Sequence, residues 1–310
     1  MRIVYMGTPM IAVTCLDRLV QDGHEIVGVY TKPDTPKNRG MKMTCSEVKT
    51  YALAHGLPVY QPQSFRDDAV VQTLQALQPE LIVAVAYGKI LPQRVLEIPP
   101  HGCVNIHASI LPQLRGAAPI QWAVLNGLDE TGVTAMFMSA GMDEGDLIAV
   151  KKTAIAPDET SEQLTGRLAE LGAELLSETV RAIAAGTVQA VKQDGAKATY
   201  APMLTKALSP IDWAKTRRQI QDQVRGLIPW PVATAELAGK RFKIFAVEPV
   251  EHGPAGRPGT LLALDKRGLV VCCADGALRV TELQAEGGKR MRAPDYFRGH
   301  PIEIGSEQGV

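Results

Sequence analysis

Residues 81–86 read Leu-Ile-Val-Ala-Val-Ala, an unbroken apolar run between Glu80 and Tyr87. A run without alternation is typical of a strand that is buried on both faces, as the inner strands of a parallel sheet are. Upstream, apolar runs at residues 3–6 and 25–30 enclose a segment with helical spacing at residues 10–22. Strands that alternate with helices predict an α/β fold with a doubly wound, mainly parallel sheet.

The same pattern continues to about residue 190 and then changes. We expect further strands at residues 57–60, 103–107, 132–138 and 146–154, and helices at residues 46–55, 67–77 and 159–185. Residues 194–208 show no strong period, and short apolar runs with turn signals such as Asp275-Gly276 follow from residue 232 onward. These features predict an α/β domain at residues 1–190, a linker at 191–208 and a small β-barrel domain at 209–310.

Composition narrows the class of protein. The chain has 310 residues, of which 45% are hydrophobic and 21% charged, as in a globular protein with two domains. Its formal net charge of +0 argues against a protein that coats nucleic acid, but not against one that grips a single RNA through local patches. The five cysteines show no paired spacing, so we expect no metal site and no disulfide framework. No membrane span or signal peptide is recognisable, so we expect a cytoplasmic protein without membrane contact.

The strand expected at residues 103–107 carries the sharpest candidate for chemistry. Asn105 and His107 stand two residues apart, and side chains at this spacing on a strand face the same way. The strand ends at His107, and ligands of open α/β sheets bind beyond the carboxyl ends of the strands. The pair therefore predicts a polar site at the edge of the sheet.

A loop between two expected strands, residues 139–146, carries two glycines and three acids, among them Asp143. Such a segment can be an ordinary acidic turn. Together with His107 it supplies what acyl transfer needs, because a carboxylate can orient an imidazole for proton transfer.

Two basic segments are candidates for contact with a substrate. Arg115 lies among small residues at 113–119, where a bulky substrate can approach closely, although a surface arginine on a turn would look the same. The loop at residues 32–42 is punctuated by Pro and Gly and contains Arg39 and Lys42. It is either a solvated surface segment or a contact to phosphates. In contrast, the turn at Gly7-Thr8-Pro9 lacks the GxGxxG pattern, which disfavours a nucleotide-dependent oxidoreductase.

Taken together, these segments resemble the folate-dependent formyltransferases. Asn-x-His followed by Ser-x-Leu-Pro, at residues 105–112, is shared by that family. Arg-Gly-Ala-Ala-Pro at 115–119, the Lys-Pro-Asp…Arg-Gly loop, and the second-domain segments 211–213 and 229–231 narrow the resemblance to the family members that act on methionyl-tRNA. The resemblance covers nearly the whole chain, from Ile3 to about Pro294.

The resemblance implies a formyltransferase-fold domain and a C-terminal OB-like β-barrel that holds tRNA together with the linker. Because the sequence leaves no additional apolar helix stripe, we expect a monomer. It implies transfer of a formyl group from the co-substrate 10-formyltetrahydrofolate to methionyl initiator tRNA, with no metal ion. The implied catalytic trio is Asn105, His107 and Asp143. The segment implied to lie against the folate consists of Ser109, Ile110, Leu111 and Pro112. The residues implied to meet the tRNA are Arg39, Lys42 and Arg115.

The chain departs from the family pattern at several positions. Glu144 stands where Thr is common, and Gln113 and Leu114 replace a basic and an aromatic residue, a change that bears on tRNA contact. The trio itself is intact. The nearest alternative is a formyltransferase that acts on a small-molecule amine, such as a ribonucleotide or an amino sugar, and a further one is a tRNA-binding protein without activity.

Overall fold

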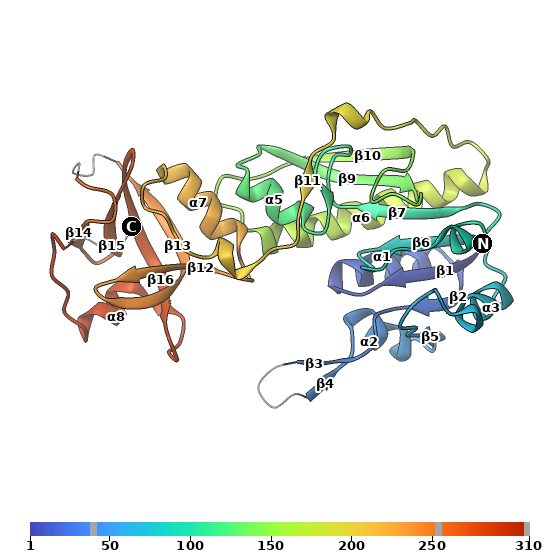
Figure 1. The fold of residues 1–310 in the computed structure, drawn as a ribbon, viewed down its shortest axis with the longest axis horizontal. Helices are drawn as coiled ribbons and strands as arrows, with labels where there is room; N and C mark the ends of the chain where they lie inside the picture. The colour runs from blue at the N-terminus through green and yellow to red at the C-terminus, as the bar shows by residue number, and fades with distance from the viewer. Residues whose placement is uncertain (38–41, 252–255, 307–310) are drawn as a thin grey trace. The chain divides into compact units, whose positions relative to one another are not determined.

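A computed structural model describes residues 1–37, 42–251 and 256–306 of the chain (Figure 1). The chain forms two compact units. The first comprises residues 1–119, 130–154 and 165–202, and the second comprises residues 120–129, 155–164 and 203–310. The expected domain limits at residues 190 and 209 stay a prediction.

A seven-stranded sheet organises the first unit, in the order β10-β9-β7-β6-β1-β2-β5. The parallel strands are β1 (Arg2–Gly7), β2 (Glu25–Tyr30), β5 (Val59–Tyr60), β6 (Leu81–Val85) and β7 (Cys103–His107). β9 (Glu130–Phe137) and β10 (Leu147–Ala154) are antiparallel, because the short loop that joins them leaves no room for a crossover. The expected doubly wound, mainly parallel sheet is confirmed, with an antiparallel edge.

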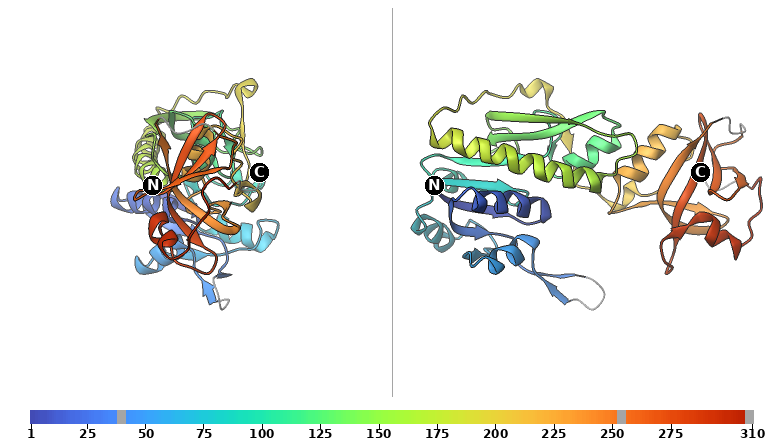
Figure 2. Two further views of the ribbon diagram at one scale, coloured as in Figure 1. Left: turned by 90° about the vertical axis from the view of Figure 1, so that its left-hand side faces the viewer. Right: turned by 180° about the vertical axis from the view of Figure 1, so that it is seen from behind.

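Helices cover both faces of this sheet (Figure 2). On one face lie α1 (Met10–Gln21) and α6 (Ser161–Ala184): the Tyr5 hydroxyl of β1 donates a hydrogen bond to Ala12 O. A Cβ atom at Gly172 of α6 would lie 3.3 Å from Ile106 of β7. On the other face, the core cluster that includes Val4 of β1 also includes Leu74 of α3 (Asp68–Ala76). Neighbouring side chains of one strand, such as Val4 and Tyr5, therefore pack against helices on opposite faces of the sheet.

Shorter elements complete the first unit. They are α2 (Glu47–Ala54), whose N-cap Ser46 accepts from Lys49 N, and α4 (Gln93–Leu96), whereas α5 (Pro119–Leu125) belongs to the second unit from Ile120 onward. β3 (Thr35–Lys37) and β4 (Lys42–Thr44) form an antiparallel hairpin where the sequence predicts only a loop. Arg39, between these strands, lies outside the described residues. β8 (Arg115–Gly116) pairs in parallel with β11 (Tyr200–Ala201), so part of the expected linker hydrogen-bonds to the first unit.

The second unit is an antiparallel sheet in the order β12-β13-β16-β15-β14. Its strands are β12 (Ala233–Leu237), β13 (Lys240–Val250), β14 (Leu261–Leu264), β15 (Leu269–Cys273) and β16 (Gly276–Ala285), with β17 (Met291–Arg292) beside β16. The helices are α7 (Arg217–Gly226) and α8 (Ala293–Arg298), and the fully buried Trp213 belongs to the core beneath them. The predicted hairpin at Asp275-Gly276 is confirmed between β15 and β16. The described strand pairs follow an open path, so barrel closure stays a prediction.

No helix in the described ranges is both long and apolar enough to span a membrane.

Candidate active site

His107 ends β7 and is almost fully buried, with 5% of its surface exposed. Its Nε2 atom lies 2.9 Å from the carbonyl oxygen of Leu114, and its Nδ1 atom lies 3.6 Å from Oδ2 of Asp143. Both neighbours are hydrogen-bond acceptors. The Nε2 atom lies within hydrogen-bond distance of its acceptor, and the Nδ1 atom lies just beyond that distance from the carboxylate. The structure therefore brings together His107 and Asp143 from two distant segments.

Asn105 lies two residues before His107 on the same strand. It is half-buried, and its partners in register are Ala84 of β6 and Met136 of β9. The period of two along a strand places its amide on the side of the sheet that His107 occupies. The trio thus combines an amide, an imidazole and a carboxylate around the end of β7.

Asp143 lies in the loop between β9 and β10, with a backbone φ of 54°. Asp tolerates this left-handed region better than most residues do. Its Oδ2 atom accepts a 2.8 Å hydrogen bond from the N–H of Gly116, which fixes the carboxylate from a second side. The loop passes so close to β9 that a Cβ atom at Gly145 would lie 1.7 Å from Phe137 O, so this path requires glycine.

The segment from Ser109 to Pro112 leaves β7 as a tight loop. Thr134 of β9 holds it in place: its hydroxyl donates to Ser109 O at 2.6 Å and accepts from Leu111 N at 3.2 Å. The Ser109 hydroxyl donates to Gln113 O at 2.6 Å and is buried, so it helps to hold the shape of the loop. Ile110 and Pro112 remain half-buried. They are the members of this segment with side-chain surface left for a ligand.

Arg115 is buried, with 5% of its surface exposed. Its Nη2 and Nε atoms donate to Oε1 of Gln193 at 2.8 and 3.2 Å, and its Nη1 atom lies 3.4 Å from Oε1 of Glu144. The guanidinium therefore contacts two side chains of the same protein, Gln193 and Glu144. The expected contact of Arg115 with tRNA stays a prediction.

Comparisons with known proteins show the family of the chain. The model of the family described as "Formyl transferase" matches residues 1–180, and "Formyl transferase, C-terminal domain" matches residues 203–301. The methionyl-tRNA formyltransferase of Geobacter metallireducens is 47% identical over 307 residues, which cover 99% of this chain and 98% of that protein. That of Alkaliphilus oremlandii is 44% identical over 309 residues and 100% of both chains. The chain belongs to the methionyl-tRNA formyltransferase family.

Solved structures share the fold beyond the methionyl-tRNA formyltransferase family. HypX from Aquifex aeolicus in complex with tetrahydrofolic acid has a TM-score of 0.67 at 18% identity, covering 100% of this chain and 51% of that chain. The N-formyltransferase from Helicobacter canadensis, in complex with folinic acid and dTDP-3-aminofucose, has a TM-score of 0.68 at 18% identity, covering 94% and 100%. At this identity the likeness shows the fold.

The tRNA residues expected of a methionyl-tRNA formyltransferase are only partly visible. Lys42 begins β4, and Arg39 belongs to the undescribed segment 38–41.

Three residues that hold the site together were missed by the sequence argument. Thr134 brackets the loop after β7, the Thr199 hydroxyl accepts from Leu114 N at 2.9 Å, and Gln193 binds Arg115. Thr134 lies on an expected strand, but no feature of the neighbouring sequence indicates that its hydroxyl binds the loop after β7. Thr199 and Gln193 lie in a stretch without periodicity, so no sequence signal indicates them.

An aromatic group gathers at the carboxyl ends of β2 and β6. Tyr30 stacks with Tyr60 at 4.9 Å between ring centroids, and Phe65 lies 6.3 Å from Tyr87. The hydroxyl groups of Tyr30 and Tyr87 are buried without a hydrogen-bond partner among the described residues. Burial raises the pKa of both phenols, so both stay neutral at physiological pH.

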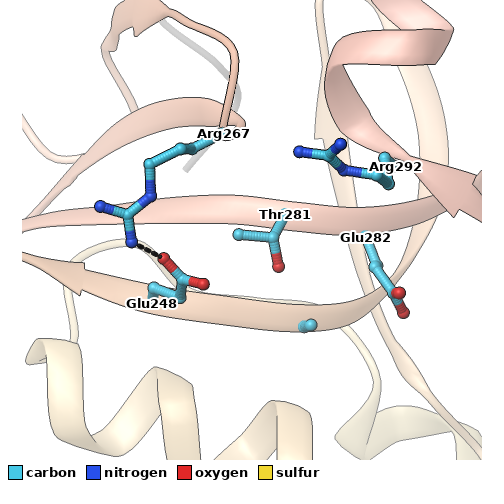
Figure 3. Close-up of a pocket in the computed structure, with 6 residues that line it drawn as sticks. Glu248, Arg267, Thr281, Glu282 and Arg292 are labelled. Carbon is cyan, nitrogen blue, oxygen red and sulfur yellow. Dashed lines mark hydrogen bonds and ion pairs between the residues drawn. The ribbon is translucent and has the colours of Figure 1, made fainter.

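The second unit carries a separate pocket of about 260 Å³ on its sheet (Figure 3). Arg267 pairs there with Glu248 at 2.5 Å, and Glu282 and Arg292 line it from β16 and β17. Two carboxylates face two guanidinium groups, so this pocket has no net charge that would select a ligand. Across the described ranges, no group of three or more His, Cys, Asp and Glu side chains is placed to hold a metal ion.

Proposed function

We propose that this chain transfers the formyl group of 10-formyltetrahydrofolate to the α-amino group of methionyl initiator tRNA, giving N-formylmethionyl-tRNA for translation initiation. The observation that carries the proposal is the placement of His107 against Asp143, with Asn105 beside it, at the carboxyl end of β7 in a chain of this family. Translation initiation places the protein in the cytoplasm, and we propose that it acts as a monomer away from membranes.

The reaction needs one bond to form and one to break. The neutral α-amine of the esterified methionine attacks the formyl carbon, and a C–N bond forms while the carbonyl oxygen gains negative charge. The bond from the formyl carbon to the folate nitrogen then breaks, and the proton lost by the amine ends on that nitrogen. No oxidant, reductant or covalent intermediate on the enzyme is required.

Asn105 and His107 supply the donors for the charged oxygen. The amide N–H of Asn105 and an N–H of His107 donate to it, and one such donor contributes about 10²–10³ in rate. His107 must release Leu114 O to point Nε2 at the substrate, and Asp143 then holds the ring through Nδ1. Asp143 is thus an orienting group, and proton transfer helped by this pair contributes about 10²–10⁴ in rate.

The co-substrate and the tRNA meet this site from different segments. Ser109 to Pro112 form the wall for the folate, with Ile110 and Pro112 as the accessible side chains. Arg39 and Lys42, from the chain segment that follows β2, contact the acceptor end of the tRNA. The family's basic second domain and linker hold the rest of the tRNA through phosphates.

The alternative acceptor is a small-molecule amine, such as a ribonucleotide or an amino sugar. The Helicobacter canadensis neighbour is described with an amino sugar nucleotide, but its 18% identity shows the shared fold alone. A small acceptor requires the trio and the folate wall, but neither the Arg39 loop nor a basic barrel.

Competition between acceptors separates the two functions. The enzyme is given 10-formyltetrahydrofolate together with charged methionyl-tRNA and either glycinamide ribonucleotide or a dTDP-amino sugar, and the formylated products are quantified. We expect formyl transfer to the tRNA and no detectable transfer to the small amines. Preferential formylation of a small amine would assign the chain to the alternative.

A further inference from the structure

Residues 191–201 are hydrogen-bonded at one end to the first residue of β10 and at the other end to β8. Val191 and Leu147 exchange two backbone hydrogen bonds of 2.8 Å. At the other end, Arg115 N donates to Thr199 O at 2.9 Å. Between these anchors, Gln193 has only 9% of its surface exposed. The segment therefore holds a buried amide against the active-site loops.

All hydrogen-bonding capacity of the Gln193 amide is used. Its Oε1 atom accepts from Nε and Nη2 of Arg115 at 3.2 and 2.8 Å. Its Nε2 atom donates to Asp143 O at 2.8 Å and to Gly145 O at 2.7 Å. A primary amide has two N–H donors and two carbonyl lone pairs, so nothing is left over. A reversed amide would place donor against donor and acceptor against acceptor, which fixes its orientation.

These four hydrogen bonds act on Asp143 from two directions. The bonds to Asp143 O and Gly145 O hold the peptide planes that follow Asp143, a residue whose φ of 54° needs support. The bonds from Arg115 hold β8, and the next residue, Gly116, donates its N–H to the Asp143 carboxylate at 2.8 Å. One side chain thus sets both the backbone of Asp143 and the donor that orients its carboxylate.

We propose that Gln193 is the positioning residue of the active site, which sets the direction of the Asp143 carboxylate toward His107. This rests on the proposed function, because it takes Asp143 as a member of the catalytic trio. Glutamate at 193 has the same shape and can still accept from Arg115. Its second oxygen would face the carbonyls of Asp143 and Gly145, and acceptor against acceptor repels. The loop would then shift without losing its packing.

The test is a double-mutant cycle on turnover. Gln193→Glu and Gln193→Met are made in the wild-type chain and in Asp143→Asn, and kcat and both KM values are measured with charged methionyl-tRNA and 10-formyltetrahydrofolate. Gln189→Glu, which adds the same charge at an exposed position just before the segment, is the matched control. Circular dichroism and thermal unfolding show whether each variant is folded.

In the wild-type chain we expect kcat to fall by about 10- to 100-fold for both Gln193 variants, with both KM values nearly unchanged, because a misplaced catalytic group costs rate. In the Asp143→Asn chain the same changes should cost nothing further, because the group they position is already disabled. Gln189→Glu should behave as wild type.

The proposal would be overturned if the Gln193 changes lowered kcat equally in the wild-type chain and in the Asp143→Asn chain. It would also be overturned if Gln193→Glu kept the wild-type kcat. Gln193→Met carries the same prediction if Gln193→Glu does not fold, and failure of both to fold would assign Gln193 to stability instead. Wild-type turnover in Asp143→Asn alone would reject the proposed trio. An impaired Asp143→Asn with an unaffected Gln193→Glu would reject only the role of Gln193.

Discussion

At the scale of single residues, the imidazole of His107 faces a carbonyl at one nitrogen and a carboxylate at the other. The carboxylate is held by Gly116 N–H, and its side chain is 16% exposed. The field of a carboxylate in such a setting is weakly screened by solvent, so the direction of the carboxylate controls the ring more strongly than it would at the surface. The two side chains act as one unit.

Replacing Asp143 by asparagine isolates the charge of this unit. Asn has nearly the same shape and tolerates the φ of 54°, so the loop should keep its path. We expect kcat/KM for methionyl-tRNA to fall by about 10²- to 10⁴-fold, because the oriented acid–base pair is lost. The melting temperature should stay close to that of wild type.

The control for this variant is Asp146→Asn, which removes the same charge from an exposed position in the same loop. It should keep normal turnover. Comparable losses in Asp143→Asn and Asp146→Asn would mean that the loop responds to net charge, and the specific role of Asp143 would be abandoned.

At the scale of elements, β9 supports the segment after β7 through a single hydroxyl. Thr134 is fully buried, and its hydroxyl bridges Ser109 O and Leu111 N. Because the segment from Ser109 to Pro112 is the proposed wall of the folate site, the position of that wall depends on a strand that never touches the ligand.

Thr134→Val removes this bridge at nearly constant volume. The buried N–H of Leu111 and carbonyl of Ser109 lose their partner, which should destabilise the fold by about 1–3 kcal/mol. We also expect a raised KM for 10-formyltetrahydrofolate with little change in KM for the tRNA. Denaturant unfolding and steady-state kinetics measure the two effects, with Thr187→Val at an exposed position as control. An unchanged folate KM would show that the wall does not depend on Thr134.

How far the sequence predicts these elements depends on how far apart along the chain the contacting residues lie. Asn105 and His107 could be placed on one side of a strand because the period of two is local. The pairing of β8 with β11 and the contact of Gln193 with Arg115 join residues about eighty positions apart, in stretches without periodicity. The β3–β4 hairpin was missed for a different reason: Pro and Gly in that stretch indicate a turn but not strands beside it.

At the scale of the whole molecule, the chain has 33 basic and 33 acidic residues, so affinity for tRNA depends on where cations lack partners. Three segments of the second unit are rich in cations, at residues 215–218, 240–243 and 289–292. In the first and third, Arg218 pairs with Asp222 and Arg290 with Glu282. On β13, Arg241 and Lys243 are exposed, and within the described ranges neither forms an ion pair.

Arg241 and Lys243 are therefore expected to contact phosphates, whereas Arg290 is not. The double change Arg241→Ala with Lys243→Ala should weaken tRNA binding and reduce the slope of log affinity against log salt by about 2, roughly 1 for each cation. Arg290→Ala should leave the slope unchanged, because that guanidinium pairs with Glu282 and lies over the Phe245 ring. Titration of fluorescent tRNA at several salt concentrations measures the slopes. If Arg290→Ala reduced the slope as much as the double change on β13 does, the proposed phosphate contacts of Arg241 and Lys243 would be rejected.

The most direct test of the whole account is formylation of methionine on the initiator tRNA itself. The purified protein is incubated with 10-formyltetrahydrofolate and charged initiator methionyl-tRNA, and N-formylmethionine is measured after hydrolysis of the ester, beside elongator methionyl-tRNA and free methionine. The account predicts rapid formylation of the initiator species and little of the other two. Consumption of 10-formyltetrahydrofolate without N-formylmethionine on the tRNA would contradict it.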